Sequence, residues 1–355
     1  MTKYMKPIFY LIIFSGTIIS SCNYNNSTIA EKSCAFSKAI DGTYIVGEKS
    51  ETIGNFGDSK LVDFQNEVYI VATLDGKLSV KKINDSSSSF ELTNPIIQSN
   101  WLDVIEDKGS ILCVTASFTD KSLRLYKIDM QSLNVNLLAT VHQYDEQLLI
   151  DPTLIKIDDK YLITYTQIKG NINNGDTLKP NGHYEVILIE SNDLINWKEV
   201  SSIVSEDTNI EDGFIYFDRD KNLLFFLYEE EVFDKKKSAI KIRKSTNRGV
   251  NWDESITLLN ANADQEPAAI FNCNKKNYLF YSSDLDNLGT SYYGAKGYIS
   301  SFSDLNYTPE QMNISLKLDY GIVLYDVMLN NNKMHFLAKK MSRNKSNVLI
   351  HYTFE

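Results

Sequence analysis

The sequence predicts an all-β fold, and three observations lead to this prediction: its aromatic composition, an internal repeat and two turns that end in Trp. The chain has 355 residues, 43% hydrophobic and 23% charged, which is enough to bury a sizeable core. It contains 21 Tyr and 17 Phe but only 6 Pro. Because Tyr and Phe favour strands, and Tyr also lines sugar sites, the composition favours a β fold.

The internal repeat consists of an acidic residue, an apolar strand, a short polar turn and a second strand rich in Tyr, Phe and Leu. Six instances recur at intervals of 43 to 62 residues, and they begin near Asp58, Asp103, Asp151, Glu211, Glu266 and Tyr325. Four short strands with their loops need about 40–50 residues, the size of one β-propeller blade. We therefore predict a six-bladed β-propeller, with five blades as the alternative, closed by an N-terminal strand or by residues 351–354.

The two Trp-closed turns are Ser191–Trp197 and Ser245–Trp252, which end the third and fourth repeats. In such a turn a polar side chain accepts hydrogen bonds from turn amides, Gly adopts a conformation that other residues avoid, and Trp packs between sheets. The second turn resembles the Asp-box of sialidase-type propellers, with Asn247 in place of the acid. The first resembles the closing hairpins of arabinanase- and xylosidase-type propellers. We expect these turns to stabilise blades and to take no part in catalysis.

The first 22 residues have the features of a bacterial lipoprotein signal. Lys3 and Lys6 precede an apolar stretch that is too short to span a bilayer, and the stretch ends in Ile19-Ser20-Ser21-Cys22. We expect residues 1–21 to be a signal peptide and Cys22 to carry lipid, with an ordinary secretory signal as the alternative. Since Asn rather than Asp occupies position 23, we expect an outer-membrane lipoprotein, on the periplasmic or the cell-surface face.

The rest of the chain divides simply. Residues 22–38 are polar and predict a tether, and residues 39–355 predict a single propeller domain. The formal charge of −10 and the absence of a basic run argue against nucleic acid as a partner. We expect a monomer that meets a carbohydrate and, through Cys22, a membrane.

Cysteine and histidine usage argues against zinc. Three cysteines follow Cys22, an odd number that cannot all pair internally, and Cys113 lies in an apolar run typical of a buried, inert thiol. No CxxC occurs and the chain has four His. We expect no cofactor and leave a structural calcium ion open.

The acidic residues that open the repeats are the candidate site. If each innermost strand comes first in its blade, these acids converge at one mouth of the propeller: Asp58, Asp103, Asp151, Glu211 or Asp212, and Glu266. Converging carboxylates repel, so some hold raised pKa values. Glycoside hydrolysis needs such a pair, one protonated and one ionised. The alternative is that the acids accept backbone hydrogen bonds or bind a structural cation, as in propellers that are only scaffolds.

This acid pattern resembles that of arabinanase/β-xylosidase-type propellers. The match lies in Leu149–Leu154, close to the family's third-blade motif, and in part in Ile210–Gly213. The resemblance implies that Asp58 is the base, that Asp151 tunes a pKa and that Glu211 is the acid. The chain departs from the family in having Ser after Asp58 where the family has Pro, and six repeats rather than five.

Other residues are candidates for substrate binding or for surface roles. We expect Trp101, Asp103, Asp212 and Glu266 to contact the substrate, and Tyr292-Tyr293 is a second candidate for stacking on sugar, with a half-buried structural aromatic as the alternative. Glu229–Glu231 with Lys235–Lys237 predicts a solvated hairpin loop. Sialidases clamp a carboxylate with three arginines, but only five arginines occur here and none lies in the first blade, which argues against that activity.

Three functional hypotheses follow. The first is a lipid-anchored glycoside hydrolase that acts on a glycan, and the second is a non-catalytic glycan-binding surface lipoprotein. The third is a protein-interaction scaffold in the envelope. Hydrolysis requires two carboxyl groups about 5–10 Å apart across an open pocket. A scaffold predicts a mouth that is plugged by side chains.

Overall fold

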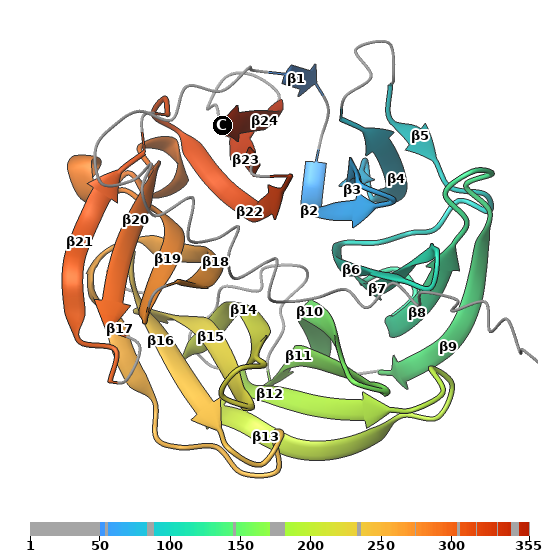
Figure 1. The fold of residues 1–355 in the computed structure, drawn as a ribbon, viewed down its shortest axis with the longest axis horizontal. Helices are drawn as coiled ribbons and strands as arrows, with labels where there is room; N and C mark the ends of the chain where they lie inside the picture. The colour runs from blue at the N-terminus through green and yellow to red at the C-terminus, as the bar shows by residue number, and fades with distance from the viewer. Residues whose placement is uncertain are drawn as a thin grey trace, which may run out of the picture.

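The computed structural model describes residues 50–53, 56–83, 89–144, 147–170, 182–232, 236–273, 275–303, 306–316, 318–331, 333–341 and 348–354. In these residues six four-stranded antiparallel sheets are arranged radially around one axis (Figure 1). The chain is therefore an all-β, six-bladed β-propeller, as the repeat predicts, and the five-bladed alternative is wrong. The signal peptide, Cys22 and the tether lie outside the described residues.

Each of the first five blades is built from four consecutive strands, the first innermost (Figure 1). Blades one and two consist of β2 (Phe56–Phe64), β3 (Glu67–Leu74), β4 (Lys77–Lys82), β5 (Glu91–Leu92), β6 (Trp101–Asp107), β7 (Ser110–Ser117), β8 (Ser122–Ile128) and β9 (Val135–Gln143). Blades three and four consist of β10 (Leu148–Ile157), β11 (Lys160–Gly170), β12 (Gly182–Ser191), β13 (Lys198–Glu206), β14 (Asn209–Asp218), β15 (Leu223–Val232), β16 (Lys237–Ser245) and β17 (Ile256–Ala263). Blade five consists of β18 (Gln265–Cys273), β19 (Lys276–Ser283), β20 (Lys296–Ser303) and β21 (Pro309–Ser315), with short 3-10 helices η2 (Leu285–Asn287) and η3 (Ser291–Tyr293) between β19 and β20.

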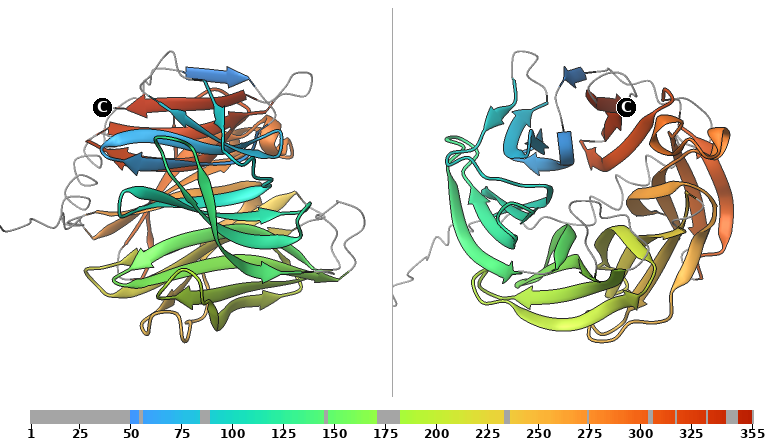
Figure 2. Two further views of the ribbon diagram at one scale, coloured as in Figure 1. Left: turned by 90° about the vertical axis from the view of Figure 1, so that its right-hand side faces the viewer. Right: turned by 180° about the vertical axis from the view of Figure 1, so that it is seen from behind.

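The sixth blade joins the two ends of the chain. Its inner strands are β22 (Ile322–Asn330), β23 (Lys333–Lys340) and β24 (Val348–Phe354), and its outer strand is β1 (Ser50–Ile53). Ser50 pairs with His351 and Ile53 with Val348, and the side view places β1 at the outer edge of the blade (Figure 2). Both of the segments predicted to close the propeller therefore do so: the N-terminal strand β1 pairs with the C-terminal strand β24 and completes its sheet.

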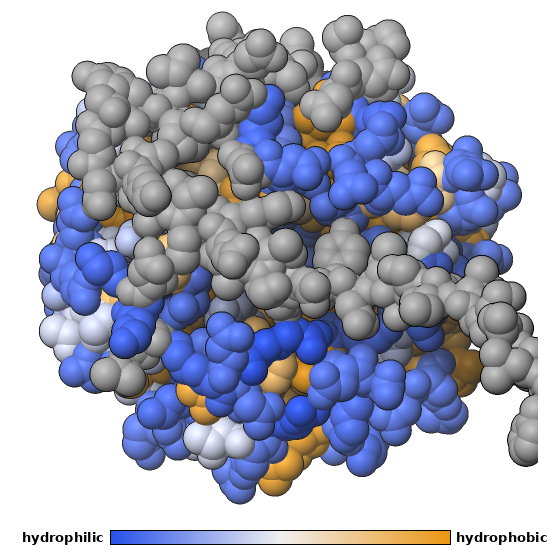
Figure 3. Space-filling model, viewed as in Figure 1, coloured by the Kyte–Doolittle hydropathy of each residue, from blue (hydrophilic) through white to orange (hydrophobic). Residues whose placement is uncertain are grey.

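The core lies between the blades rather than at the centre. Among the described residues, six apolar clusters form, each shared by two neighbouring blades. A strand in the middle of a blade is covered on both faces, and all eight residues of β7 are buried for this reason. The smallest cluster joins blades six and one through Leu61, Ile70, Leu337 and Leu349. On the face shown in Figure 3, polar side chains dominate the described surface.

Both Trp-closed turns make the expected local hydrogen bonds. In the fourth blade Asn247 Oδ1 accepts the amide of Asn251 at 2.8 Å, and Gly249 has φ +91°. The Trp252 indole N–H donates to the carbonyl of Gly249 at 3.0 Å. In the third blade Asp193 accepts the amides of two following residues, and Leu194, at φ +66°, takes the left-handed conformation.

The cysteines and the helices add two observations. Cys113 is a free, fully buried thiol, as expected, and Cys273 is disulfide-bonded. Cys34 and residues 171–181 lie outside the described residues. No helix in the described part of the chain is long and apolar enough to span a bilayer.

Candidate active site

A pocket of about 390 Å³ opens at one mouth of the propeller, and residues from all six blades line it. The lining combines carboxyl groups with two lysines and several aromatic rings. Its ionisable members are Asp58, Lys60, Asp151, Glu211, Asp212, Glu266, Tyr292, Tyr325 and Lys339.

β-Bulges on the innermost strands position these side chains. The register shifts in β2, β10, β14, β18 and β22 but not in β6, and Asp58, Asp151, Asp212 and Tyr325 lie within the shifts. A bulge inserts an extra residue and re-aims its side chain. Asp151 and Asp212 have φ of +47° and +49°, a left-handed conformation uncommon outside Gly. Backbone strain at these two acids is typical of a functional site.

Hydrogen bonds accepted by aspartate side chains join four of the six innermost strands to the next blade. In four of the six seams an aspartate carboxylate accepts a main-chain amide of the following blade: Asp58 from Leu102 at 2.9 Å, Asp103 from Leu154 at 2.7 Å, Asp151 from Asp212 at 2.9 Å and Asp326 from Leu61 at 2.7 Å. A buried amide without a partner would be costly, so these acids help to fix the angle between blades. The alternative to catalysis, in which the acids accept backbone hydrogen bonds, therefore holds for these four aspartates.

Glu211 has the environment of a general acid. It lines the pocket, its Oε1 atom is buried without a hydrogen-bond partner, and its side chain also hydrogen-bonds to Asn209. Burial first, and then the charges of Asp151 and Asp212, raise the pKa of Glu211 well above its usual range. Burial and Asp212 likewise raise the pKa of Asp151. A raised pKa favours the protonated form of the carboxyl group, which is the form that a general acid needs.

Asp58 differs from these two because a cation lies beside it. Burial raises its pKa, but Lys60 and the amides of Leu102 and Ser59 act in the opposite direction. Burial alone would lower the pKa of Lys60, yet the carboxylates of Asp58 and its neighbours raise it above its ordinary value. The ammonium of Lys60 therefore stays charged and favours the ionised form of Asp58.

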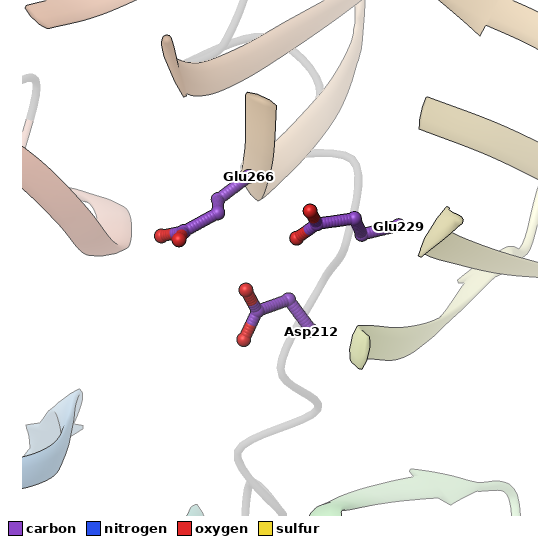
Figure 4. Close-up of side chains that lie close together, drawn as sticks. All are labelled: Asp212, Glu229 and Glu266. Atoms are coloured by element: carbon purple, nitrogen blue, oxygen red, sulfur yellow. The ribbon is translucent and has the colours of Figure 1, made fainter. Parts of the chain in front are cut away.

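Asp212, Glu229 and Glu266 form a compact carboxyl cluster. One oxygen from each lies within 4.8 Å of the others, and the three groups point toward a common space (Figure 4). Asp212 and Glu229 share a hydrogen bond, which requires one of them to be protonated. Burial raises the pKa of Asp212 to about 6, and burial with the charge of Asp212 raises those of Glu229 and Glu266 well above their usual range. An oxygen-only set of this kind suits a hard cation such as Ca²⁺ and does not suit zinc.

The structure brings together most of the predicted site residues. Asp58, Asp151, Glu211, Asp212, Glu266 and Trp101 all line the pocket. Asp103 is not among the lining residues, and its carboxylate instead accepts the amide of Leu154. Tyr292 also lines the pocket, and its hydroxyl hydrogen-bonds to Glu266.

Glu229, Lys60 and Lys339 were not predicted as site residues. The interpretation of Glu229–Glu231 as a solvated loop is wrong: all three lie in β15, and Glu229 is only 5% exposed. The signal that could have found Glu229 is the hairpin register, which pairs it with Glu211 on the same sheet face. The lysines gave no signal, because nothing in their local sequence separates them from surface lysines.

The described arginines lie elsewhere. Arg219 and Arg248 pair with Asp158, Arg124 with Asp120, and Arg243 donates to the carbonyl of Ile203. No arginine is among the pocket-lining residues in the described part of the chain. The geometry thus offers paired carboxyl groups for acid–base chemistry and no clamp of arginines for an acidic sugar.

Comparison with known proteins identifies the fold and no family. No family model and no curated protein matches the sequence. Among solved structures, an α-L-arabinofuranosidase from Fusarium graminearum in complex with an iminosugar inhibitor aligns with a TM-score of 0.61 at 10% identity, over 88% of this chain and 98% of that one. An α-L-arabinanase from Penicillium chrysogenum in complex with arabinobiose aligns with a TM-score of 0.57 at 11% identity, over 87% and 98%. A protein of unknown function from Dyadobacter fermentans aligns with a TM-score of 0.62 at 10% identity, over 87% and 98%. The chain therefore has the β-propeller fold that these two glycoside hydrolases also have.

Proposed function

We propose that this protein is a glycoside hydrolase. One observation carries the proposal: carboxyl groups from four different blades line one open pocket, and burial together with their mutual repulsion raises their pKa values. The pocket volume of about 390 Å³ is within the range of small-ligand sites. An open pocket also argues against the scaffold hypothesis, which requires a plugged mouth.

The environments of three acids support distinct roles. Glu211, whose Oε1 atom is buried without a hydrogen-bond partner, is the proposed general acid that protonates the leaving oxygen. Asp151 is the proposed modulator, because after burial its charge contributes most to the raised pKa of Glu211. Asp58, beside Lys60, is the proposed base. The cluster of Asp212, Glu229 and Glu266 is the competing constellation, and its spacing within 4.8 Å is nearer to that of a retaining pair than an inverting one.

The charge of the lining favours neutral glycans over acidic ones. Five carboxyl groups but only two lysines are among the lining residues. No arginine is among the described lining residues, so the carboxylate of a uronic or sialic acid would have no bidentate partner there. The solved structures with this fold include the arabinanase and also an exo-β-1,3-galactanase from Phanerochaete chrysosporium, which aligns with a TM-score of 0.51 at 12% identity over 77% of this chain and 62% of that one. Arabinan and β-1,3-galactan are therefore the first substrates to test.

The test is hydrolysis by the purified protein of chromogenic glycosides, arabinan and β-1,3-galactan, compared with Glu211→Gln. We expect cleavage by the wild type and a loss of at least about a hundredfold in the variant. Glu254→Gln, at an exposed position of the fourth blade, is the matched control and should retain activity. If Glu229→Gln abolishes cleavage while Glu211→Gln keeps it, the acid belongs to the competing cluster. If the wild type binds a glycan without cleaving it, the protein is a glycan-binding module.

We also propose that Cys22 anchors the protein to the outer membrane. The basic region at Lys3 and Lys6, the short apolar stretch and Ile19-Ser20-Ser21-Cys22 support this. Metabolic labelling with a palmitate analogue should mark the wild type and not Cys22→Ala. Labelling of both proteins would remove the proposal.

A further inference from the structure

Exposed tyrosines lie at the rim of the pocket, and the proposed chemistry does not use them. Tyr292, which lines the pocket, is 41% exposed, Tyr293 is 44% exposed and Tyr320 is 51% exposed. We name these three residues the tyrosine shelf. They come from the loop that contains η3 in blade five and from the segment that leads into β22 of blade six.

Main-chain hydrogen bonds hold the two halves of the shelf together. The amides of Gly321 and Ile322 both donate to the carbonyl of Ala295, at 2.8 and 3.1 Å. A Cβ at Gly321 would lie 3.3 Å from the carbonyl oxygen of Tyr293, so the two backbones are in close contact there. The amide of Met341, which lines the pocket, donates to the carbonyl of Gly321 at 2.8 Å. The shelf is therefore continuous with the pocket.

A buried acid fixes the shape of the η3 loop. Asp284 is fully buried, and its carboxylate accepts the amides of Asp264, Thr290 and Ser291 at 2.9 to 3.0 Å. Ser291 has φ +52°, a conformation that these hydrogen bonds maintain. A loop that is ordered before the ligand arrives loses little entropy on binding.

The chemistry of the shelf suits sugar. The ammonium of Lys296 lies 3.9 Å from the centre of the Tyr320 ring and 3.2 Å from Asp286. Rings that offer an apolar face beside charged hydrogen-bonding groups match a sugar, which has a C–H face and a rim of hydroxyls. We infer that the tyrosine shelf binds the sugar units that follow the one in the pocket, so that the substrate is a glycan chain rather than a small glycoside. The inference rests on the proposed function for its pocket sugar.

The test compares short and long substrates with the full-length protein. We would measure kcat/KM for 4-nitrophenyl glycosides and for the matching arabino- and β-1,3-galacto-hexasaccharides. In Tyr320→Ala and Tyr293→Ala, the ratio of hexasaccharide to aryl-glycoside kcat/KM should fall about tenfold, mainly through KM. Tyr320→Phe keeps the ring and should keep the ratio. Ile195→Ala removes an apolar side chain that is 64% exposed, more than any of the shelf tyrosines, from a turn of blade three and should not change the ratio.

Other outcomes separate this inference from the proposed function. An unchanged ratio in both alanine variants, or an equal fall for both substrates, overturns the shelf while leaving hydrolysis in place. If the wild type cleaves nothing, affinity electrophoresis in gels that contain arabinan or galactan replaces kinetics. Retardation that is lost in Tyr320→Ala then supports the shelf without catalysis, and equal mobility overturns it. Self-association of the wild type that Tyr320→Ala abolishes would assign the surface to a second copy of the chain and overturn it as well.

Discussion

Asp326 Oδ2 accepts the main-chain amide of Leu61 at 2.7 Å, across the seam where the last blade meets the first. The other oxygen of the same carboxylate accepts the amide of Val327 at 2.8 Å. Of the apolar clusters in the described residues, the smallest lies at this seam.

Asp326→Ala should lower the free energy of unfolding by about 2–3 kcal/mol, because it leaves two amides without partners. Asn keeps one acceptor oxygen and should cost less. Urea unfolding measures both. Asp319→Ala, which removes a largely exposed ion pair with Lys340, is the control and should change stability by less than about 1 kcal/mol. Equal effects at positions 326 and 319 would show that the seam does not depend on Asp326.

Gly249 and Gly289 have similar φ angles but different surroundings, so alanine at each position separates the cost of packing from the cost of backbone strain. A Cβ at Gly249, in the Trp-closed turn of blade four, would lie 2.2 Å from Cδ2 of Leu188, whereas a Cβ at Gly289 would meet nothing within 4 Å. Their φ angles are +91° and +80°. Gly289→Ala should therefore cost about 1 kcal/mol from backbone strain alone, and Gly249→Ala at least about 1 kcal/mol more from overpacking. Thermal unfolding of both variants measures the difference, and equal losses would contradict the packing argument.

His335 and His351 should make the sixth blade sensitive to acid. Both are buried, their ring nitrogens lie 3.0 Å apart, and burial is the main cause that lowers their pKa values to about 4 and about 3. The unfolded chain binds protons near pH 6.5 and the folded one does not, so the stability they contribute is lost as pH falls from about 6.5 toward 3. The positive charge of Lys333 also lowers both pKa values, and that of Lys81 lowers the pKa of His351.

In the double variant His335→Leu/His351→Leu, the fall in melting temperature between pH 7 and pH 4.5 should be smaller than in the wild type. His183→Gln, at a partly exposed position paired with Asp207, is the control and should leave the wild-type slope. A double variant with an unchanged slope would mean that other groups set the acid sensitivity.

Asp151→Asn should shift the pH profile of hydrolysis. Asp151 raises the pKa of Glu211, so removing its charge lowers that pKa, and the alkaline limb of kcat/KM should move to lower pH. The amide oxygen of Asn can still accept the amide of Asp212, which preserves the seam. A fall in rate at every pH without a shift would indicate that Asp151 acts only through structure.

The sequence by itself predicted the blades and the acids. Strand and turn patterns are local, so the six repeats, the inner position of each first strand and the Trp-closed turns were all recognisable, and Asp58, Asp151, Glu211, Asp212 and Glu266 followed from where the repeats begin. Bulges cannot be read from a pattern of period two, and they contain three of the acids that line the pocket: Asp58, Asp151 and Asp212. Asp103, on the one innermost strand without a register shift, stays outside it.

Only the tertiary structure revealed Glu229, Lys60 and the position of Tyr320 beside the Tyr292-Tyr293 pair that the sequence offers as a stacking candidate. Glu229 stands in an acidic run typical of a solvated loop, and its burial depends on the register of a strand whose partner carries a bulge. Tyr293 and Tyr320 are separated by 26 residues and a whole hairpin of blade five, and they meet because two amides bind one carbonyl of Ala295. Local sequence determines which strands form, whereas the closure of a ring determines which distant side chains share its mouth.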